Sequence, residues 1–318
     1  MPLVRDEQGP FLEPSQVPAL RADLIDVSSV FNPGAVRVKD RDLLLLRVQT
    51  RGRTTLLMPA EASDLGVEFL GLPLDLTALR PRAAHVYDPR LTQIGDTTFA
   101  ICAADTDDGC ALVTLATDDF EHWEIVAVDT SEDHRNGVLF PEKIGGRFVR
   151  LTRPNHLAVE GGPRTGSTIR CSTSEDLVVW EDAGEVMHGR PRLWDEIIGS
   201  GPPPVKTRDG WLHVYHGVAT HFGAANIYQA GVVLLDSDEP WQVVARGAFN
   251  ILEPRRIWEQ TGQVPNVVFP SGLTVDLDPD GIAAGETAVT VYYGAADTVV
   301  GRAATTIADL IDEAHFAG

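Results

Sequence analysis

Ser172-Thr173-Ser174-Glu175-Asp176-Leu177-Val178-Val179-Trp180-Glu181 is the stretch that predicts the fold, because two looser copies of it stand elsewhere in the chain. Each copy places an Asp in a polar turn and a Trp a few residues later, where the next strand is expected to begin. The other copies are Ala116-Thr117-Asp118-Asp119-Phe120-Glu121-His122-Trp123-Glu124 and Leu234-Leu235-Asp236-Ser237-Asp238-Glu239-Pro240-Trp241-Gln242. Recurrence at a nearly constant distance is the signature of a repeat architecture.

A second recurring unit, a turn followed by an alternating strand, precedes each of these stretches. Its copies are Ile94-Gly95-Asp96-Thr97-Thr98-Phe99-Ala100-Ile101, Ile144-Gly145-Gly146-Arg147-Phe148-Val149-Arg150-Leu151 and Thr207-Arg208-Asp209-Gly210-Trp211-Leu212-His213-Val214. Short apolar or alternating runs separated by Gly, Asp, Asn and Pro are typical of all-β proteins. At roughly sixty residues for each four-stranded blade, the repeats predict an all-β, five-bladed β-propeller. The alternatives are a large β-sandwich and two stacked β domains.

The chain shows no linker, charge block or shift in composition, so a single domain over residues 1–318 is expected. Residues 1–25 are polar and contain prolines, which indicates an irregular N-terminal lead-in. Helical spacing of apolar residues occurs only over 305–314, and it predicts a short C-terminal helix with a Thr cap.

Composition excludes several classes of protein. The formal net charge of −20 argues against nucleic acid or an anionic membrane as a partner, since both attract a basic surface. No apolar run is long enough to span a membrane and the first residues do not resemble a signal peptide, so a cytoplasmic protein is expected. The three cysteines lack metal-site spacing, and neither a cofactor nor a metal is expected. The sequence leaves a homo-oligomer open.

A candidate proton donor, Asp88, lies in the strand-like run 84–91. Alternation places its carboxyl on one face with Val86 and Arg90, and Tyr87 on the other face. A carboxyl among apolar neighbours favours its neutral form and can release a proton near neutral pH. The alternative is that this Asp is only a turn residue before a proline.

Four more polar residues stand at the ends of apolar strand faces, namely Asp105, Arg153, His216 and Asp297. Each alone has a simple structural explanation, such as a turn cap, a solvated cation or a buried imidazole. In a propeller the innermost strands line the central channel, so polar strand ends in equivalent positions of the repeat are expected to converge there. Alternation turns Arg150 away from this set.

The segment 133–144 adds Arg135, Asn136 and Lys143 just ahead of the strand that carries Arg153. Two arginines, an Asn and a His around a small volume suit a tetrahedral oxyanion, because guanidinium groups match phosphate oxygens in a bidentate way. In so acidic a chain, such a cluster would be a specific feature. The alternative is that Arg135 and Lys143 pair with neighbouring acids of the same segment at the surface.

At these residues the sequence resembles glycoside hydrolase family 130, the inverting β-mannoside phosphorylases and related mannosidases built on a five-bladed β-propeller. The motifs that carry the resemblance run in the same order over about residues 30–300: Asn32-Pro33-Gly34-Ala35, Tyr87-Asp88-Pro89-Arg90, Arg135-Asn136 with Leu139-Phe140-Pro141-Glu142-Lys143-Ile144, Leu151-Thr152-Arg153-Pro154, Gly199-Ser200-Gly201-Pro202-Pro203-Pro204, Gly210-Trp211-Leu212 through Tyr215-His216-Gly217, Gly231-Val232-Val233-Leu234-Leu235-Asp236, and Val264-Pro265-Asn266-Val267-Val268-Phe269-Pro270-Ser271-Gly272.

The resemblance implies that Asp88 is the general acid and passes its proton through a hydroxyl of the mannosyl unit. It implies that phosphate, the nucleophile and co-substrate, is held by Arg135, Asn136, Arg153 and His216. It also implies a carbohydrate site: Asn32 and Asp297 would bind the mannose, Asp105 would lie near the acceptor sugar, and Tyr87, Arg90 and Lys143 would complete the substrate contacts.

The reaction so implied is inverting phosphorolysis of a β-linked mannoside to α-mannose 1-phosphate and a shortened sugar. The chain departs from the family pattern at Ile197, where phosphorylases often carry a phosphate-binding lysine. An inverting β-mannosidase therefore stays as an alternative, with Glu196, Glu253 or Glu259 helping to activate water. A non-catalytic sugar-binding propeller is the second alternative.

Overall fold

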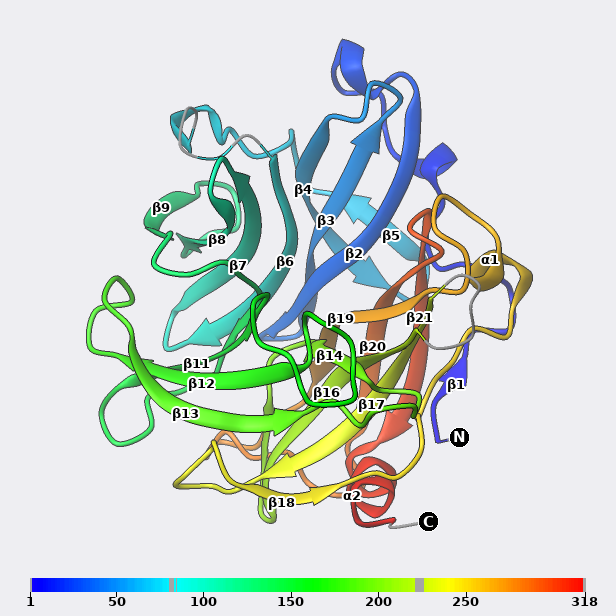
Figure 1. Cartoon of the computed structure of the whole chain (residues 1–318). Coiled ribbons are helices and arrows are strands. Elements are labelled where there is room, and N and C mark those ends of the chain that lie inside the picture. The colour runs from blue at the N-terminus through cyan, green and yellow to red at the C-terminus, as the bar shows by residue number, and fades with distance from the viewer. Residues whose placement is uncertain (1, 80–82, 84, 221–225, 317–318) are drawn as a thin grey trace.

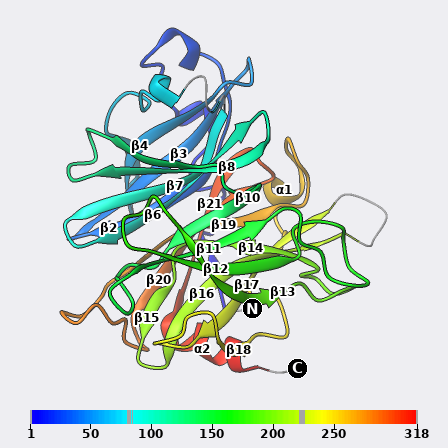
Figure 2. The same ribbon diagram turned by 60° about the vertical axis from the view of Figure 1, so that its left-hand side comes forward.

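Five antiparallel sheets stand around a central axis as the blades of a propeller (Figures 1 and 2). The computed structural model describes residues 2–79, 83, 85–220 and 226–316. Blade 1 consists of β2 (Val27–Val38), β3 (Arg41–Thr50), β4 (Thr55–Ser63) and β5 (Gly66–Phe69). Blade 2 consists of β6 (His85–Ile94), β7 (Thr97–Thr106), β8 (Gly109–Thr117) and β9 (Glu124–Asp129). Blade 3 consists of β10 (His134–Leu139), β11 (Phe148–Pro154), β12 (Thr168–Ser174) and β13 (Glu181–His188). The predicted propeller is confirmed.

The last two blades differ slightly from this plan. Blade 4 is β14 (Ile197–Ser200), β16 (Gly210–Ala219), β17 (Ile227–Leu235) and β18 (Val243–Arg246), with β15 (Val205–Thr207) also paired to β16. Blade 5 is β19 (Val268–Val275), β20 (Ala288–Ala295), β21 (Val299–Thr306) and β1 (Val4–Arg5). The innermost strands are therefore β2, β6, β10, β14 and β19.

Strand β1 corrects the expectation of an irregular lead-in over residues 1–25. Val4 and Arg5 pair with Ala304 and Ala303 of β21. The N-terminal segment therefore supplies the outer strand of blade 5, and the C-terminal part of the chain supplies its other three strands. The guanidinium of Arg5 then binds the buried carboxylate of Glu259 at 2.7 Å. A strand of two residues is too short to show alternation, which is why the sequence pattern did not reveal it.

The repeated Asp residues act as turn caps between the third and fourth strands of blades 2, 3 and 4. A side-chain oxygen of Asp176 accepts hydrogen bonds from the backbone N–H groups of Val178 and Val179, both at 2.9 Å. Asp119 and Asp236 make the equivalent pair of bonds in the other two turns. A carboxylate that satisfies two turn N–H groups fixes the hairpin, which explains why this stretch recurs.

Packing between blades accounts for most of the core. Separate clusters of buried apolar side chains fill the contacts between blades 1 and 2, 2 and 3, 3 and 4, 4 and 5, and 5 and 1. Helix α2 (Ile307–His315) packs Ile307, Leu310 and Ala314 into one of these clusters, and its cap is Thr306, whose hydroxyl accepts from the backbone N–H of Asp309. The predicted C-terminal helix is confirmed, two residues later at its start.

The remaining helical elements are short. They are η1 (Pro14–Gln16), η2 (Ala22–Leu24), η3 (Thr77–Leu79) and the single turn α1 (Ile257–Gln260), none of which the sequence pattern predicted. No helix in the described part of the chain has the length and apolar character needed to cross a membrane. All three cysteines are buried and free.

Candidate active site

A polar cavity of about 480 Å³ opens at the end of the central channel where the innermost strands begin. Its walls come from all five blades. The lining residues are Asn32, Arg47, His85, Tyr87, Asp88, Ala103, Asp105, Arg135, Asn136, Arg153, His216, Tyr228, Val264, Val267, Phe269 and Asp297. The polar strand ends that the sequence singled out, Asp105, Arg153, His216 and Asp297, thus share one cavity with Asp88.

Bulges in three of the innermost strands turn site residues into this cavity. The strand registers shift next to Asn32 in β2, Asp88 in β6 and Asn136 in β10. These residues have left-handed backbones, with φ of 45°, 53° and 53°. Asn and Asp tolerate that conformation better than other residues with a side chain. The bulge also breaks strict alternation in β6, so the predicted sharing of a face by Asp88 and Arg90 is wrong.

The carboxylate of Asp88 sits in a charged setting and not among the apolar neighbours that the sequence suggested. One oxygen accepts from the Asn32 amide at 2.9 Å and from the Arg47 guanidinium at 2.7 Å. Burial alone would raise the pKa of Asp88, but the charges of Arg47 and Arg90 outweigh it and hold the pKa below its usual value. In the free chain this carboxyl is therefore ionised at neutral pH.

Arg90 lies beneath the cavity floor and not on its surface. Its side chain is 1% exposed, and it donates to the backbone carbonyl of Gly201 at 2.8 Å and to that of Asp88 at 2.9 Å. The guanidinium also stacks on the ring of Phe269. The predicted substrate contact of Arg90 is thus replaced by support of the Asp88 backbone from below.

Asp297 is the carboxyl in the cavity that retains a proton closest to neutral pH. It lies in the turn between β20 and β21 with φ of 50°, and it lines the cavity together with Asp88. Burial, followed by the charge of Asp88, raises the pKa of Asp297 to about 6. The cavity therefore combines one carboxylate that cations hold ionised with one that is protonated in mildly acidic solution.

A basic corner, formed by Arg135, Asn136, Arg153 and His216, occupies the side of the cavity built by blades 3 and 4. Among the described residues, no carboxylate lies within ion-pair distance of either arginine, and Nε of each guanidinium is buried without a hydrogen-bond partner. Burial and the charge of Arg135 lower the pKa of Arg153 to about 10. Two partly buried cations that have no ion-pair partner among the described residues form a site suited to an anion.

His216 contributes to this corner as a neutral imidazole, because burial and then the charges of Arg153 and Arg90 hold its pKa well below the usual value. Glycine at position 199 makes room for it. A Cβ there would lie 2.7 Å from Nε2 of His216 and 2.6 Å from the side-chain oxygen of Asn136. The closely spaced polar atoms of the corner therefore require Gly199 at the start of the Gly-Ser-Gly-Pro loop.

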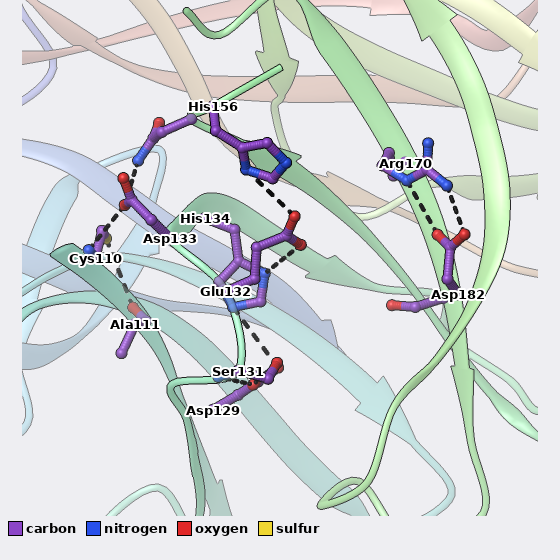
Figure 3. Close-up of polar contacts among 12 residues, drawn as sticks. Cys110, Ala111, Asp129, Ser131, Glu132, Asp133, His134, His156, Arg170 and Asp182 are labelled. Carbon is purple, nitrogen blue, oxygen red and sulfur yellow. Dashed lines mark hydrogen bonds and ion pairs between the residues drawn. The ribbon is translucent and has the colours of Figure 1, made fainter. Parts of the chain in front are cut away.

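Neighbouring acids do not neutralise Arg135, which answers the alternative raised above. Asp133 instead accepts from the backbone N–H of Cys110 at 2.9 Å and from the Asn155 amide at 2.7 Å (Figure 3). His134 lies between Asp129 and Glu132 in the same network (Figure 3). These contacts fix the segment that leads into β10. The Asp133 carboxylate is bonded to Cys110 and Asn155 and forms no ion pair with Arg135.

The side of the cavity near blades 1 and 2 presents a different chemistry. Asp105 hydrogen-bonds through one oxygen to Nδ1 of His85 at 2.9 Å and accepts through the other from the Tyr87 hydroxyl at 3.0 Å. Nε2 of His85 contacts the hydroxyl of Thr55 on β4 at 2.6 Å. The Asp105 side chain is still 51% exposed, so its oxygens remain accessible at the rim.

Other predicted residues lie elsewhere. Lys143 is exposed and its ammonium lies over the ring of Phe148, outside the cavity. The acids considered for water activation, Glu196, Glu253 and Glu259, do not line the cavity either. A Cβ on Gly166 would contact both Ile197, at 3.1 Å, and Nε of Arg153, at 3.4 Å, so the isoleucine lies beside the basic corner.

Sequence reasoning gave no site role to four lining residues with charged or aromatic side chains, Arg47, His85, Tyr228 and Phe269, nor to the small or aliphatic Ala103, Val264 and Val267. A signal existed for Arg47, a lone cation inside the apolar strand Leu43-Leu44-Leu45-Leu46-Arg47-Val48, and for His85, at the start of the quoted run. Tyr228 and Phe269 sit in ordinary-looking strands, and only the assembled ring brings them to the cavity.

Comparison with known proteins gives consistent matches. The family model described as beta-1,4-mannooligosaccharide phosphorylase matches residues 5–315. A Beta-1,4-mannooligosaccharide phosphorylase of Ruminococcus albus is 41% identical over 180 residues, which are 56% of this chain and half the length of that relative. A 1,2-beta-oligomannan phosphorylase of Thermoanaerobacter sp. is 32% identical over 251 residues, 77% of each chain.

Solved structures agree with the fold. A Beta-1,2-Mannobiose phosphorylase from Listeria innocua, in complex with beta-1,2-mannobiose, superimposes with a TM-score of 0.82 at 25% identity and covers 99% of both chains.

Proposed function

The chain belongs to glycoside hydrolase family 130, and from that premise we propose that it catalyses the inverting phosphorolysis of a β-linked mannoside or manno-oligosaccharide. The products are α-mannose 1-phosphate and a sugar shortened by one unit. The observation that carries the proposal is the basic corner, where the guanidinium groups of Arg135 and Arg153, which have no carboxylate partner in the described part of the chain, line the same cavity as Asp88. The site draws on residues from Asn32 to Asp297, so we propose that the chain acts as one catalytic domain.

Phosphate binding is assigned to Arg135, Asn136, Arg153 and His216. Guanidinium groups donate in a planar fork that matches two phosphate oxygens, and the neutral imidazole adds a donor without adding charge. The global charge of −20 opposes any anion, so a local cluster is needed to hold one in this chain. Ile197 adds no charge to this corner, which leaves the arginines as its cations.

Sugar binding is assigned to the opposite side of the cavity. We assign Asn32 and Asp297, which line the cavity with Asp88, to the mannosyl unit, and Asp105 with Tyr87 to the acceptor sugar. In an inverting reaction the nucleophile and the leaving group occupy opposite faces of the anomeric carbon. Asp105 and Tyr87 belong to blade 2, whereas the basic corner belongs to blades 3 and 4, so we propose that the acceptor sugar and the phosphate approach the anomeric carbon from different sides.

Asp88 is proposed as the proton donor, through a hydroxyl of the bound mannose. Its carboxyl is ionised in the free chain, so it must take up a proton in the complex. A phosphate dianion in the basic corner adds negative charge to the cavity, which raises the pKa of Asp88. An unprotonated oxygen of the phosphate dianion bonds to the anomeric carbon as the bond from that carbon to the leaving oxygen breaks. The leaving oxygen takes the proton of the mannose hydroxyl, and that hydroxyl takes the proton of Asp88, which returns to its ionised form. The mannose 1-phosphate monoanion then releases its remaining phosphate proton to solvent, which balances the proton that Asp88 had taken up.

The test is the dependence of turnover on phosphate. Mannobiose with a β-1,4 or β-1,2 linkage is incubated with and without inorganic phosphate, and mannose 1-phosphate and free mannose are quantified separately. We expect mannose 1-phosphate that rises with phosphate until saturation. Free mannose formed at a rate independent of phosphate would instead identify an inverting mannosidase.

The role of Asp88 is tested by Asp88→Asn. Asn has nearly the same size as Asp and also tolerates the left-handed backbone at this position. Turnover is expected to fall at least about a hundredfold, the usual contribution of a general acid. Asp96→Asn is the matched control, since it changes an exposed aspartate in the turn between β6 and β7. Equal turnover in both variants would exclude Asp88 as the proton donor, whereas no turnover in the natural protein or in either variant would favour a sugar-binding protein without catalysis.

A further inference from the structure

Glu259 of α1 is a fully buried carboxylate that lies outside the cavity and has no part in the proposed reaction. The Arg5 guanidinium of β1 donates to both of its oxygens, at 2.7 and 3.1 Å. The Tyr293 hydroxyl of β20 donates to it at 2.9 Å, and the backbone N–H groups of Arg255 and Arg256 donate at 2.7 and 2.8 Å. A buried carboxylate with this many donors is costly to disturb, so it fixes β1, β20 and α1 against one another.

The segment that follows α1, residues 261–267, connects this carboxylate residue with the cavity. The backbone N–H of Val267 donates to the backbone carbonyl of Glu259 at 3.0 Å. Val264 and Val267 both line the cavity. The position of α1 therefore determines where this part of the cavity wall lies.

The same segment also holds the turn between β20 and β21 that carries Asp297. The backbone N–H of Val264 donates to the carbonyl of Ala296 at 3.2 Å, and the backbone N–H of Ala296 donates to the carbonyl of Val267 at 3.1 Å. The contact is close, since a Cβ at Gly262 would lie 2.7 Å from Cβ of Ala296. The segment and the turn therefore move together.

The turn needs this support because of its backbone conformation. Ala296 and Asp297 are both left-handed, with φ of 46° and 50°. That conformation is unfavourable for residues such as Ala and persists only where the surrounding structure imposes it. Without the segment in place the turn can relax, and the carboxyl of Asp297 then leaves its position in the cavity.

The phosphate side of the cavity is held independently of α1. Arg135 and Arg153 pair with each other across β10 and β11 of blade 3. The segment does bond to Tyr228, whose backbone N–H donates to the carbonyl of residue 266. Tyr228 is, however, also paired with Val218 in the ladder of β16 and β17. A shift of the segment should therefore affect the side of Asp297 more than the basic corner.

We propose that Arg5 and Glu259 are positioning residues for Asp297, so that the N-terminal strand β1 sets the affinity of the cavity for the sugar and not for phosphate. This inference rests on the proposed phosphorolysis, in which Asp297 binds the mannosyl unit. Removing the Arg5 cation leaves Glu259 buried without its counter-charge, which displaces α1 and the segment behind it. The effect should appear in the KM for the mannoside, whereas a mere loss of folded enzyme lowers the measured turnover and leaves both KM values unchanged.

The experiment measures kcat, the KM for a β-mannoside and the KM for phosphate in three variants, Arg5→Met, Gly262→Ala and Arg302→Met. Gly262→Ala pushes the segment off the turn while Arg5 and Glu259 stay unchanged, so it tests the inference even if Arg5→Met does not fold. Arg302→Met is the matched control, because Arg302 of β21 binds Asp6 at 2.8 Å and anchors the same N-terminal arm. Urea unfolding establishes that each variant is folded under the assay conditions.

We expect the KM for the mannoside to rise about tenfold in Arg5→Met and Gly262→Ala, the effect of losing about one hydrogen bond to the sugar, while the KM for phosphate stays within about twofold of its natural value. Both constants should stay within about twofold in Arg302→Met. Arg5→Lys, which keeps a cation beside Glu259, should recover most of the affinity for the mannoside.

An unchanged KM for the mannoside in folded Arg5→Met or in Gly262→Ala overturns the inference. An equal rise in Arg302→Met, or an equal rise in the KM for phosphate, overturns it as well. A natural protein without phosphate-dependent turnover overturns the proposed function itself, so the two failures are distinct.

Discussion

Replacing Asp297 with Asn should make the protein more stable at alkaline pH and leave its stability in acid nearly unchanged. Asn has the same shape, tolerates the left-handed backbone with φ of 50°, and carries no charge. The natural carboxyl has a pKa of about 6 in the folded chain against 3.8 for an ordinary aspartate. Its ionisation beside Asp88 is therefore a cost that the folded state bears and the unfolded state does not.

The sign follows from proton binding. Between pH 3.8 and about 6 the folded chain binds more protons than the unfolded chain, so the contribution of Asp297 to stability is fully present below pH 3.8 and is lost as the pH rises through 6. The rise of about 2 units in the pKa of Asp297 lowers the free energy of unfolding by about 3 kcal/mol at pH 8, where the carboxyl is ionised in both states. At pH 4 the same rise lowers it by only about 0.5 kcal/mol. The stability difference between the Asn variant and the natural protein should thus grow by about 2.5 kcal/mol from pH 4 to pH 8.

The assay is urea unfolding followed by tryptophan fluorescence at pH 4, 6 and 8, with the slope of the transition checked for each variant. Asp96→Asn, at an exposed turn, is the control and should show no such growth with pH. A stability difference that stays constant over this pH range would refute the reasoning, whatever its size. If Asp297 also binds mannose as proposed, the stabilised variant should lose catalytic efficiency, as often happens when repulsion in a site is removed.

Three further substitutions test other parts of the structure. Arg153→Met should raise the KM for phosphate by roughly 10- to 100-fold, the worth of a charge-assisted hydrogen bond, in initial-rate measurements over a range of phosphate concentrations. Gly199→Ala should displace the side chain of His216, weakening phosphate binding and lowering stability by about 1–3 kcal/mol in urea unfolding. Arg5→Met should leave the buried carboxylate of Glu259 without its cation and cost about 3 kcal/mol by the same assay.

Two of these substitutions, Arg153→Met and Arg5→Met, have a control at the surface. Arg170 lies opposite Thr152 in the strand next to Arg153 and pairs with Asp182 outside the cavity (Figure 3), so Arg170→Met should leave the KM for phosphate unchanged. Arg21 forms an exposed pair with Asp23, and Arg21→Met should cost no more than about 0.5 kcal/mol. An equal effect of control and test substitution would contradict the assigned roles.

The fold was largely predictable because its repeating parts are local. The turn that Asp176 caps is complete within a few residues, so its chemistry is visible in a short stretch and recurs in blades 2, 3 and 4. The closure of the ring was not predictable in this way. β1 has two residues, and its pairing with β21 and the bond from Arg5 to Glu259 join residues at opposite ends of the chain.

The candidate site was predictable where a strand continues regularly up to a polar residue, as at Arg153 and His216. Alternation failed at Asp88, because a bulge shifts the register between Tyr87 and Arg90. The charge environment of Asp88 could be inferred only in part from neighbours in sequence. Burial raises its pKa, and the charges of Arg47 and Arg90 lower it; Arg90 is two residues away, but Arg47 comes from another blade and alternation alone does not place it there.

The bulges explain why site residues and backbone conformation depend on each other. A regular strand directs only every second side chain to the channel, whereas a bulge with a left-handed residue redirects one more. For most side chains that backbone costs about 1–2 kcal/mol, and for Asn and Asp it costs less. Asn32, Asp88 and Asn136 therefore serve twice, as polar groups in the cavity and as residues able to occupy the bulge. The turn-like pairs Asn-Pro, Asp-Pro and Asn-Gly at these points mark bulges in continuous strands, and they indicate the site because the bulge and the chemistry require the same residue types.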